Sequence, residues 1–160
     1  MTREEFKEIA NYIGDIIKDT PWYQHIYIVG GSVRDFYMGN DIKDIDLVID
    51  LPNGGVDFAN WCKDQGYTKT VVIYETYGTA AMKMLNQDIE CVMTRGEKYL
   101  DDGTRNPTVE FADLKEDAFR RDLTINALYY NVSTGEILDP TGYGIKDIDN
   151  KICRAPMELR

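Results

Sequence analysis

Hydrophobic residues near the N-terminus recur at intervals of three and four residues. Thr2 and Glu5 precede them with the spacing of a capping box, in which two side chains satisfy free backbone N–H groups at a helix start. The pattern continues to a break at Thr20 and Pro21. It predicts an amphipathic helix with an inward face of Phe6, Ile9, Ala10, Ile13, Ile16 and Ile17.

Short apolar runs, rich in β-branched residues or alternating with polar ones, predict strands. In the clearest run, Ile45, Leu47 and Ile49 share one face. Asp44 and Asp46 then share the other face, because successive side chains of a strand point to opposite sides. We expect five strands in one sheet, near residues 26–29, 45–49, 71–76, 79–85 and 88–94.

The remaining segments predict helices and loops. Residues 32–39 form a helical turn, and residues 56–66 form a helix. Residues 96–107 combine charges with glycine and proline, which indicates a mobile surface loop. Residues 114–131 are helical in their first part, and residues 133–152 alternate turns with short strands. In the helix predicted at residues 56–66, the side chains of Val56, Ala59 and Cys62 should point inward.

Length and charge limit the possible functions. At 160 residues and 18.4 kDa, with no internal repeat, the chain predicts a single domain over residues 1–160, of mixed α/β class with a sheet flanked by helices. The 18 basic and 28 acidic residues give a formal charge of -10. This sign excludes a protein whose whole surface neutralises phosphates, so any contact with nucleic acid must be local or lie outside this chain.

The cysteines do not suggest a disulfide framework or a zinc site. Cys62, Cys91 and Cys153 are widely spaced, no C-x-x-C pair occurs, and His25 is the only histidine. The sequence has no apolar signal segment and no run of about 18 apolar residues that would span a membrane. We therefore expect a cytoplasmic protein with reduced thiols and no membrane partner.

Asp44 and Asp46 are the first candidates for chemistry. Two carboxylates on one face of a strand repel each other, and a bound cation relieves that repulsion. Mg²⁺ favours such oxygen ligands and keeps open positions for water and phosphate oxygens. The alternative is a solvated polar face, which is common for exposed aspartates.

A glycine pair after the first predicted strand suggests a phosphate site. Gly30, Gly31 and Ser32 would let backbone N–H groups approach an anion at the start of a helix. Arg34 would clamp the same phosphates through two parallel hydrogen bonds. The alternative is an ordinary glycine turn with a surface arginine. The stretch matches neither G-x-G-x-x-G nor the P-loop, and a single histidine disfavours a Ser-His-Asp or Cys-His site.

The order of these motifs resembles a known family. Residues 28–50 contain G-G-x-V-R-D followed by D-x-D, and residues 120–131 read RRDLTINALYYN. Weaker matches lie at residues 77–83, 89–95 and 135–148. Together these blocks resemble the tRNA nucleotidyltransferase (CCA-adding enzyme) and bacterial poly(A) polymerase family, the class II branch of the polymerase-β-like nucleotidyltransferases.

The resemblance implies roles for individual residues. Asp44 and Asp46 would bind two Mg²⁺ ions, and Glu90 would be a third catalytic carboxylate that helps deprotonate the attacking hydroxyl. Glu90 is equally compatible with a surface position on a strand, and Arg95 and Arg120 with structural ion pairs. The residues that would bind the nucleotide are Gly30, Gly31, Ser32, Arg34, Asp35, Arg121, Asp122 and Asn126.

The implied activity is transfer of a nucleoside monophosphate from an NTP, ATP or CTP, to an RNA or tRNA 3′ end. The alternatives are an enzyme that acts on a non-RNA acceptor and a nucleotide-binding module without turnover. The family's base-selecting E-D-x-x-R block lies later, in a helical neck, and neither that later block nor the neck, body and tail domains follow residues 120–131 in these 160 residues. We therefore expect either a catalytic head from a longer protein or a natural minimal enzyme. The choice between ATP and CTP, between CCA addition and polyadenylation, the acceptor and the oligomeric state stay open.

Overall fold

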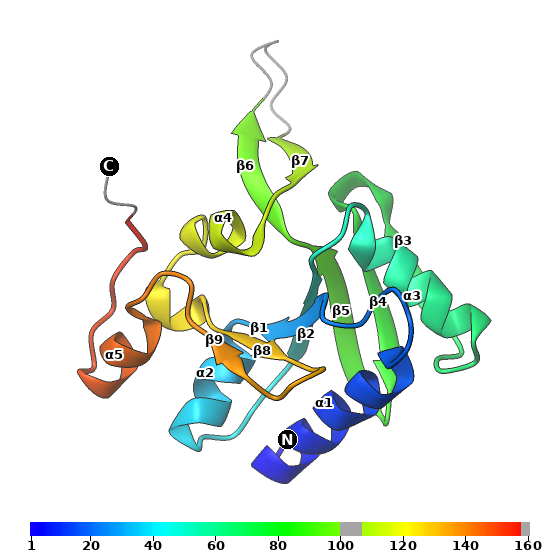
Figure 1. Cartoon of the computed structure of the whole chain (residues 1–160), viewed down its shortest axis with the longest axis horizontal. Coiled ribbons are helices and arrows are strands. Elements are labelled where there is room, and N and C mark those ends of the chain that lie inside the picture. Colours follow the sequence, from blue (N-terminus) through cyan, green and yellow to red (C-terminus); the bar gives the residue numbers. More distant parts are fainter. Residues whose placement is uncertain (100–106, 158–160) are drawn as a thin grey trace.

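The computed structural model describes residues 1–99 and 107–157. A seven-stranded sheet forms the centre, in the order β3-β4-β5-β2-β1-β8-β9 (Figure 1). The parallel pairing of β2 with β5 makes the sheet mixed, since the other neighbours pair antiparallel. The strands are β1 (Ile26–Val29), β2 (Ile45–Ile49), β3 (Val71–Tyr74), β4 (Thr79–Met84), β5 (Gln87–Met93), β8 (Tyr129–Asn131) and β9 (Ile137–Leu138). The five expected strands lie in this sheet, and the mixed α/β fold is confirmed.

Three helices, α1 (Arg3–Ile17), α2 (Gly31–Met38) and α3 (Gly54–Asp64), pack against one face of the sheet and bury the main core. The capping box of α1 is present, with Glu5 N–H donating to Thr2 Oγ1 over 3.1 Å and Thr2 N–H to Glu5 Oε1 over 3.0 Å. Phe6 stacks on Phe36 at 4.4 Å, which joins α1 to α2. The apolar face expected for the first helix is therefore the one that is buried.

The opposite face of the sheet is covered only in part. There α4 (Leu114–Phe119) contributes Ala118 to a smaller cluster with side chains of β1, β2 and β8. Tyr129 lies at its centre and is fully buried. The 3-10 turns η1 (Glu75–Tyr77) and η2 (Thr124–Asn126) flank this side. Because the cluster does not extend over the start of β2, the polar side chains there stay accessible.

Part of the segment expected to be a mobile loop is a hairpin. β6 (Arg95–Tyr99) pairs antiparallel with β7 (Pro107–Phe111), so the expectation is wrong for the ends of residues 96–107. Residues 100–106 of that expected loop lie outside the described residues. The charged, glycine-containing composition does not predict these strands, because their stability comes from pairing with each other and from contact of β6 with α4.

Two further expectations need correction. Residues 133–152 contain a helix, α5 (Gly144–Asp149), as well as turns and strand β9. Asp139 accepts hydrogen bonds from the N–H groups of Gly144 (3.0 Å) and Ile145 (3.1 Å), so a carboxylate upstream of the helix supports its start. The helix expected at residues 56–66 begins at Gly54, and Phe58 is fully buried in place of Val56.

Candidate active site

Three carboxylates come together where β2 begins. Asp46 lies on β2 and is in register with Glu90 on the parallel neighbour β5. Residues in register on adjacent strands point to the same face, with the strands about 4.8 Å apart. Asp44 precedes the first residue of β2, two positions from Asp46. All three side chains are exposed to solvent on the partly covered face of the sheet.

The electrostatics of this group favour a cation. The pKa of Asp46 is raised, first by the protein that surrounds its carboxylate and then by the charges of Glu90 and Asp44. The positive charge of Arg121 acts in the opposite direction and lowers the pKa of Asp46. Among the described residues, no group of three or more His, Cys, Asp or Glu side chains is arranged to hold a metal ion. Uncompensated carboxylate oxygens nevertheless fit a hard divalent cation that completes its coordination with water or phosphate.

The glycine turn lies at the end of β1, beside Asp46 in the sheet order. Gly30 has φ 87°, a left-handed value that side chains rarely tolerate, and it caps α2. The N–H groups of Val33 and Arg34 donate to the carbonyl of Gly30, so the N–H groups of Gly31 and Ser32 are the ones left for an anion at the start of α2. The hydroxyl of Ser32 donates to the carbonyl of Val29 (3.3 Å), so Ser32 would contribute its backbone and not its side chain.

Arg34 extends over this turn. A Cβ atom on Gly31 would lie 3.2 Å from Nη2 of Arg34, so only a glycine leaves the guanidinium in this place undisturbed. Arg34 Nε donates to Asp35 (3.2 Å) and Nη1 to Asn126 (2.7 Å). Asp35 thus holds Arg34 in position. Among the described residues, Arg34 is the only polar partner of the Asp35 side chain.

The second sequence block meets the first through Asn126. Its amide oxygen accepts from Arg34, and its amide nitrogen donates to Asp122 over 3.3 Å. Asp122 also accepts from the N–H of Leu123 over 2.8 Å, which fixes the entry to η2. The structure therefore joins Asn126 and, through it, Asp122 to the guanidinium of Arg34, whereas Arg121, the third expected residue of the second block, binds Asp117 and Tyr129.

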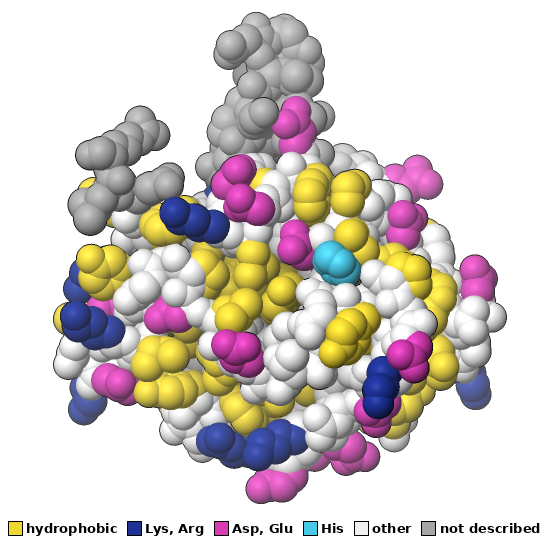
Figure 2. Space-filling model, viewed as in Figure 1, with side chains coloured by type: hydrophobic (Ala, Val, Ile, Leu, Met, Phe, Trp, Pro, Cys, Tyr) yellow, Lys and Arg dark blue, Asp and Glu magenta, His cyan; other side chains and the backbone are white. Residues whose placement is uncertain are grey.

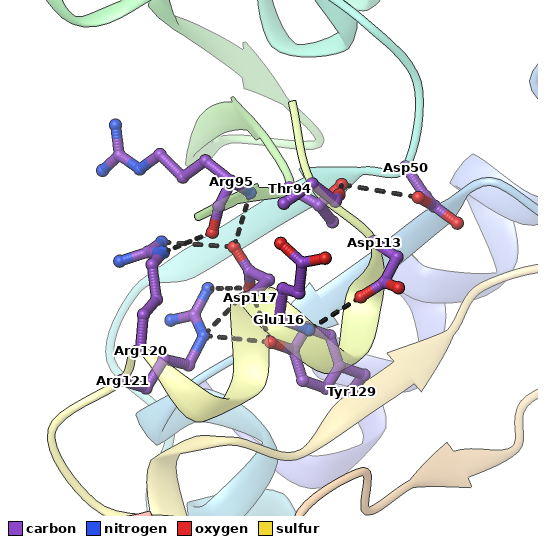
Figure 3. Close-up of polar contacts among 10 residues, drawn as sticks. Asp50, Thr94, Arg95, Asp113, Glu116, Asp117, Arg120, Arg121 and Tyr129 are labelled. Atoms are coloured by element: carbon purple, nitrogen blue, oxygen red, sulfur yellow. Dashed lines mark hydrogen bonds and ion pairs between the residues drawn. The ribbon is translucent and has the colours of Figure 1, made fainter. Parts of the chain in front are cut away.

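Asp117 is a buried hub that the sequence did not reveal as such (Figure 3). Its Oδ2 binds Arg121 Nη2 at 3.0 Å and accepts from the hydroxyl of Tyr129. Its Oδ1 binds Arg120 Nη2 at 3.2 Å. The spacing of Asp117 from Arg120 and Arg121, three and four residues on a helix, is the signal that could have found it.

Arg95 and Arg120, which the sequence left open as structural ion-pair partners, differ in the structure. Arg120 is a structural ion-pair partner, as its contacts with Asp117 and with the carbonyl of Arg95 show. Arg95 contacts Asp117 only through its backbone N–H, at 2.9 Å. Its guanidinium has no ion pair among the side chains that the structure describes, those of residues 1–96 and 110–157, and it points away from Asp117 in Figure 3. The ion-pair interpretation therefore has no support for Arg95 among these side chains.

Comparison with known proteins now identifies the family. Residues 26–154 match the model of the poly(A) polymerase head domain. The chain belongs to this family. The CCA-adding enzyme of Enterococcus faecalis is 38% identical over 94% of the chain, and the tRNA nucleotidyltransferase cca1 of Schizosaccharomyces pombe is 33% identical over 95%.

A solved structure agrees with the head-domain assignment. A tRNA nucleotidyltransferase complexed with a primer tRNA and an incoming ATP analogue superposes with a TM-score of 0.70 and 29% identity, over 91% of this chain and 39% of that one. The chain spans 34% of the E. faecalis relative and 32% of the S. pombe relative. No helix among the described residues is long and apolar enough to cross a membrane.

Proposed function

We propose that this head domain transfers a nucleoside monophosphate from an NTP to the 3′-hydroxyl of an RNA, with tRNA as the favoured acceptor. The observation that carries the proposal is the row of carboxylates on β2 and β5 beside a glycine turn covered by Arg34. The relatives named above, a CCA-adding enzyme and a tRNA nucleotidyltransferase, support the reaction and the acceptor. The solved complex with primer tRNA and an ATP analogue supports both substrates.

Asp44 and Asp46 would hold Mg²⁺, for which their hard, mutually repelling oxygens are suited. When bound, Mg²⁺ neutralises the phosphate oxygens and favours the ionised form of the attacking hydroxyl. The N–H groups at the start of α2, together with Arg34, would bind the triphosphate and stabilise the charge that grows on the leaving pyrophosphate. Asp122 and Asn126 would position the nucleotide from the η2 side.

Glu90 would accept the proton of the attacking hydroxyl, a role that its exposed position beside Asp46 supports. The 3′-oxygen forms a bond to the α-phosphorus while the bond from that phosphorus to the bridging oxygen of pyrophosphate breaks. Arg121, held by Asp117, would moderate the negative charge of Asp46. The described cysteines are free, which fits a reducing compartment such as the cytoplasm.

The formal charge of -10 favours one second candidate, the same transfer to a small non-RNA hydroxyl. An incorporation assay separates the two. Labelled NTP is supplied with tRNA that lacks its 3′-terminal nucleotides, or with small alcohols, amines and sugars. Label on tRNA supports the proposal, and label only on a small acceptor overturns the RNA part of it.

Variants test the site itself. Asp46→Asn should lower the rate of transfer by at least about 100-fold, because asparagine keeps the size of the side chain but removes the charged metal ligand. Arg34→Lys should weaken NTP binding by about 10-fold, since a lysine cannot form the two parallel hydrogen bonds. Asp88→Asn is the matched control, an exposed aspartate on β5. Unchanged transfer in Asp46→Asn, or equal NTP affinity in EDTA and in Mg²⁺, would contradict the site.

A further inference from the structure

A pocket of about 390 Å³ opens on the same face of the sheet as the carboxylates. Its volume is within the usual range for ligand sites, about 300–1,000 Å³. Neither the bound triphosphate nor the cation proposed above would fill it. Its lining residues are Tyr74, Tyr77, Thr79, Ala81, Glu90 and Arg95.

The strand register places this pocket relative to the reaction. Ala81 on β4 is in register with Glu90 on β5, and Glu90 is in register with Asp46 on β2. The pocket therefore begins one strand from Asp46, toward the β3 edge. The glycine turn and Arg34 follow β1, which is the neighbour of β2 on its other side. Asp46 thus lies between the proposed triphosphate site and the pocket.

The two tyrosines of the pocket are unusually exposed. Tyr74 ends the edge strand β3 and is 51% exposed, and Tyr77 in η1 is 64% exposed. Neither ring packs on another aromatic ring within the described residues. Edge strands usually carry polar groups that prevent association, so exposed apolar side chains on one indicate a binding surface. The small side chains of Thr79 and Ala81 leave room for a flat ring beside the tyrosines.

Arg95 supplies a positive charge at the same pocket. Its side chain is partly buried, and its guanidinium has no ion pair with the described side chains, those of residues 1–96 and 110–157. Burial and the nearby charge of Arg120 lower its pKa, so the cation is less stable here than in water. A phosphate of a bound strand would relieve both effects and would place the strand next to Glu90.

We propose that this pocket binds the 3′-terminal nucleotide of a single-stranded RNA acceptor, with its base stacked on Tyr74 or Tyr77 and its 5′-phosphate on Arg95. The inference rests on the proposed function and assigns the acceptor subsite within it. In-line transfer requires the attacking and leaving oxygens on opposite sides of the phosphorus. With pyrophosphate leaving toward Arg34, the attacking hydroxyl must come from the side of Glu90, where the pocket lies.

Stacking of the terminal base can be measured without turnover. A short single-stranded RNA carries 2-aminopurine, whose fluorescence falls on stacking, either at its 3′ end or at an internal position. The wild-type chain should quench the 3′ probe more strongly than the internal probe. Tyr74→Ala with Tyr77→Ala should weaken binding by about 5- to 100-fold, the range of one base stacked on an aromatic ring.

The control variants separate stacking from folding. Tyr74→Phe with Tyr77→Phe keeps both rings and should retain the quenching, as should Tyr23→Ala, which removes a tyrosine of similar exposure (45%) outside the pocket. Arg95→Gln should reduce the slope of log affinity against log salt by about 0.7, the value for one phosphate of a single strand. Equal slopes in wild type and Arg95→Gln would overturn the role given to Arg95.

NTP binding by the same variants distinguishes a failure of the acceptor-site inference from a failure of the proposed function. Unchanged affinity for Mg²⁺-ATP and Mg²⁺-CTP in the double alanine variant supports an acceptor site. A large loss of NTP affinity with unchanged RNA quenching would overturn the inference, because the pocket would then hold the base of the NTP. Quenching that is equal in wild type and the double alanine variant would overturn it too. A wild-type chain that binds no NTP would contradict the proposed function instead.

Discussion

At the scale of single residues, the folded protein disfavours the ionised form of the Asp46 carboxylate. Protein around the carboxylate, Glu90 and Asp44 all raise its pKa, and only Arg121 opposes them. Folding therefore favours the protonated form of Asp46. Between the unfolded pKa, about 3.9, and the raised folded value, the native state binds more protons, so this contribution to stability falls as the pH rises.

Asp46→Asn should consequently raise the melting temperature of the metal-free chain at neutral pH. The gain should shrink as the pH falls from the raised folded pKa toward the unfolded pKa, and it should be absent below the unfolded pKa, because Asp46 is then neutral in both states. Thermal unfolding in EDTA across this pH range measures the effect, with Asp88→Asn as the exposed control on the same strand as Glu90. A variant less stable than wild type at neutral pH would show that the surrounding carboxylates do not strain Asp46.

Addition of Mg²⁺ should reverse the order of stability. A ligand that binds only the folded state stabilises it by about 2.7 kcal/mol at a concentration 100 times its dissociation constant. Wild type should gain this stabilisation, whereas Asp46→Asn should gain little. The crossing of the two stabilities between EDTA and Mg²⁺ is observable in the same unfolding experiments. Equal stabilisation of both proteins would place the cation elsewhere.

At the scale of elements, β5 matters most for the site because it carries Glu90 and pairs with both β2 and β4. Helix α3 packs closely on the back of β5 through Gly55. A Cβ atom on Gly55 would lie 2.7 Å from the carbonyl oxygen of Cys91 and 2.8 Å from the Cα of Val92. These are backbone atoms of β5, which cannot move without moving Glu90.

Gly55→Ala should destabilise the fold by about 1–3 kcal/mol, the range for overpacking a core. Because it displaces β5, it should also lower the rate of transfer more than it lowers NTP affinity, since the proposed triphosphate site belongs to β1 and α2. Urea unfolding and steady-state kinetics measure the two effects. Lys63→Ala, an exposed change on the same helix, should alter neither. A stable Gly55→Ala variant with normal kinetics would contradict this packing.

At the scale of the whole molecule, the acidic charge limits what this chain does alone. Acidic side chains are spread over the face in Figure 2, and no continuous basic patch is visible among the residues shown in colour there. With a formal charge of -10, long-range attraction to RNA is absent, so the acceptor must be held by local contacts. We expect the affinity for tRNA to be weak and to depend on the few side chains that contact the acceptor.

The chain alone should bind ATP, CTP, GTP and UTP with affinities within about 10-fold of each other, a difference of about 1.4 kcal/mol. The contacts proposed above involve the triphosphate and not the base, and no E-D-x-x-R block follows residues 120–131, where the family has its base-selecting block. Calorimetric titration with each NTP in Mg²⁺ tests this. Strict preference for one base would show that these residues read the base themselves.

The sequence alone determined the features that depend on neighbouring residues. Alternation put Asp44 and Asp46 on the outward face of β2, and the glycine pair between strand and helix marked the turn at Gly30. The spacing of apolar residues gave α1 with its capping box. These features are local, since side-chain direction and allowed φ values follow from a few adjacent positions.

Only the tertiary structure decided which distant residues meet. The parallel pairing of β2 with β5 brought Glu90 to Asp46, and packing of η2 on α2 brought Asn126 to Arg34. Local composition also misled for the hairpin β6–β7 and for α5, whose stability comes from contacts with other segments. Strand order and helix packing are set by burial of the whole core, so no short window of sequence contains them.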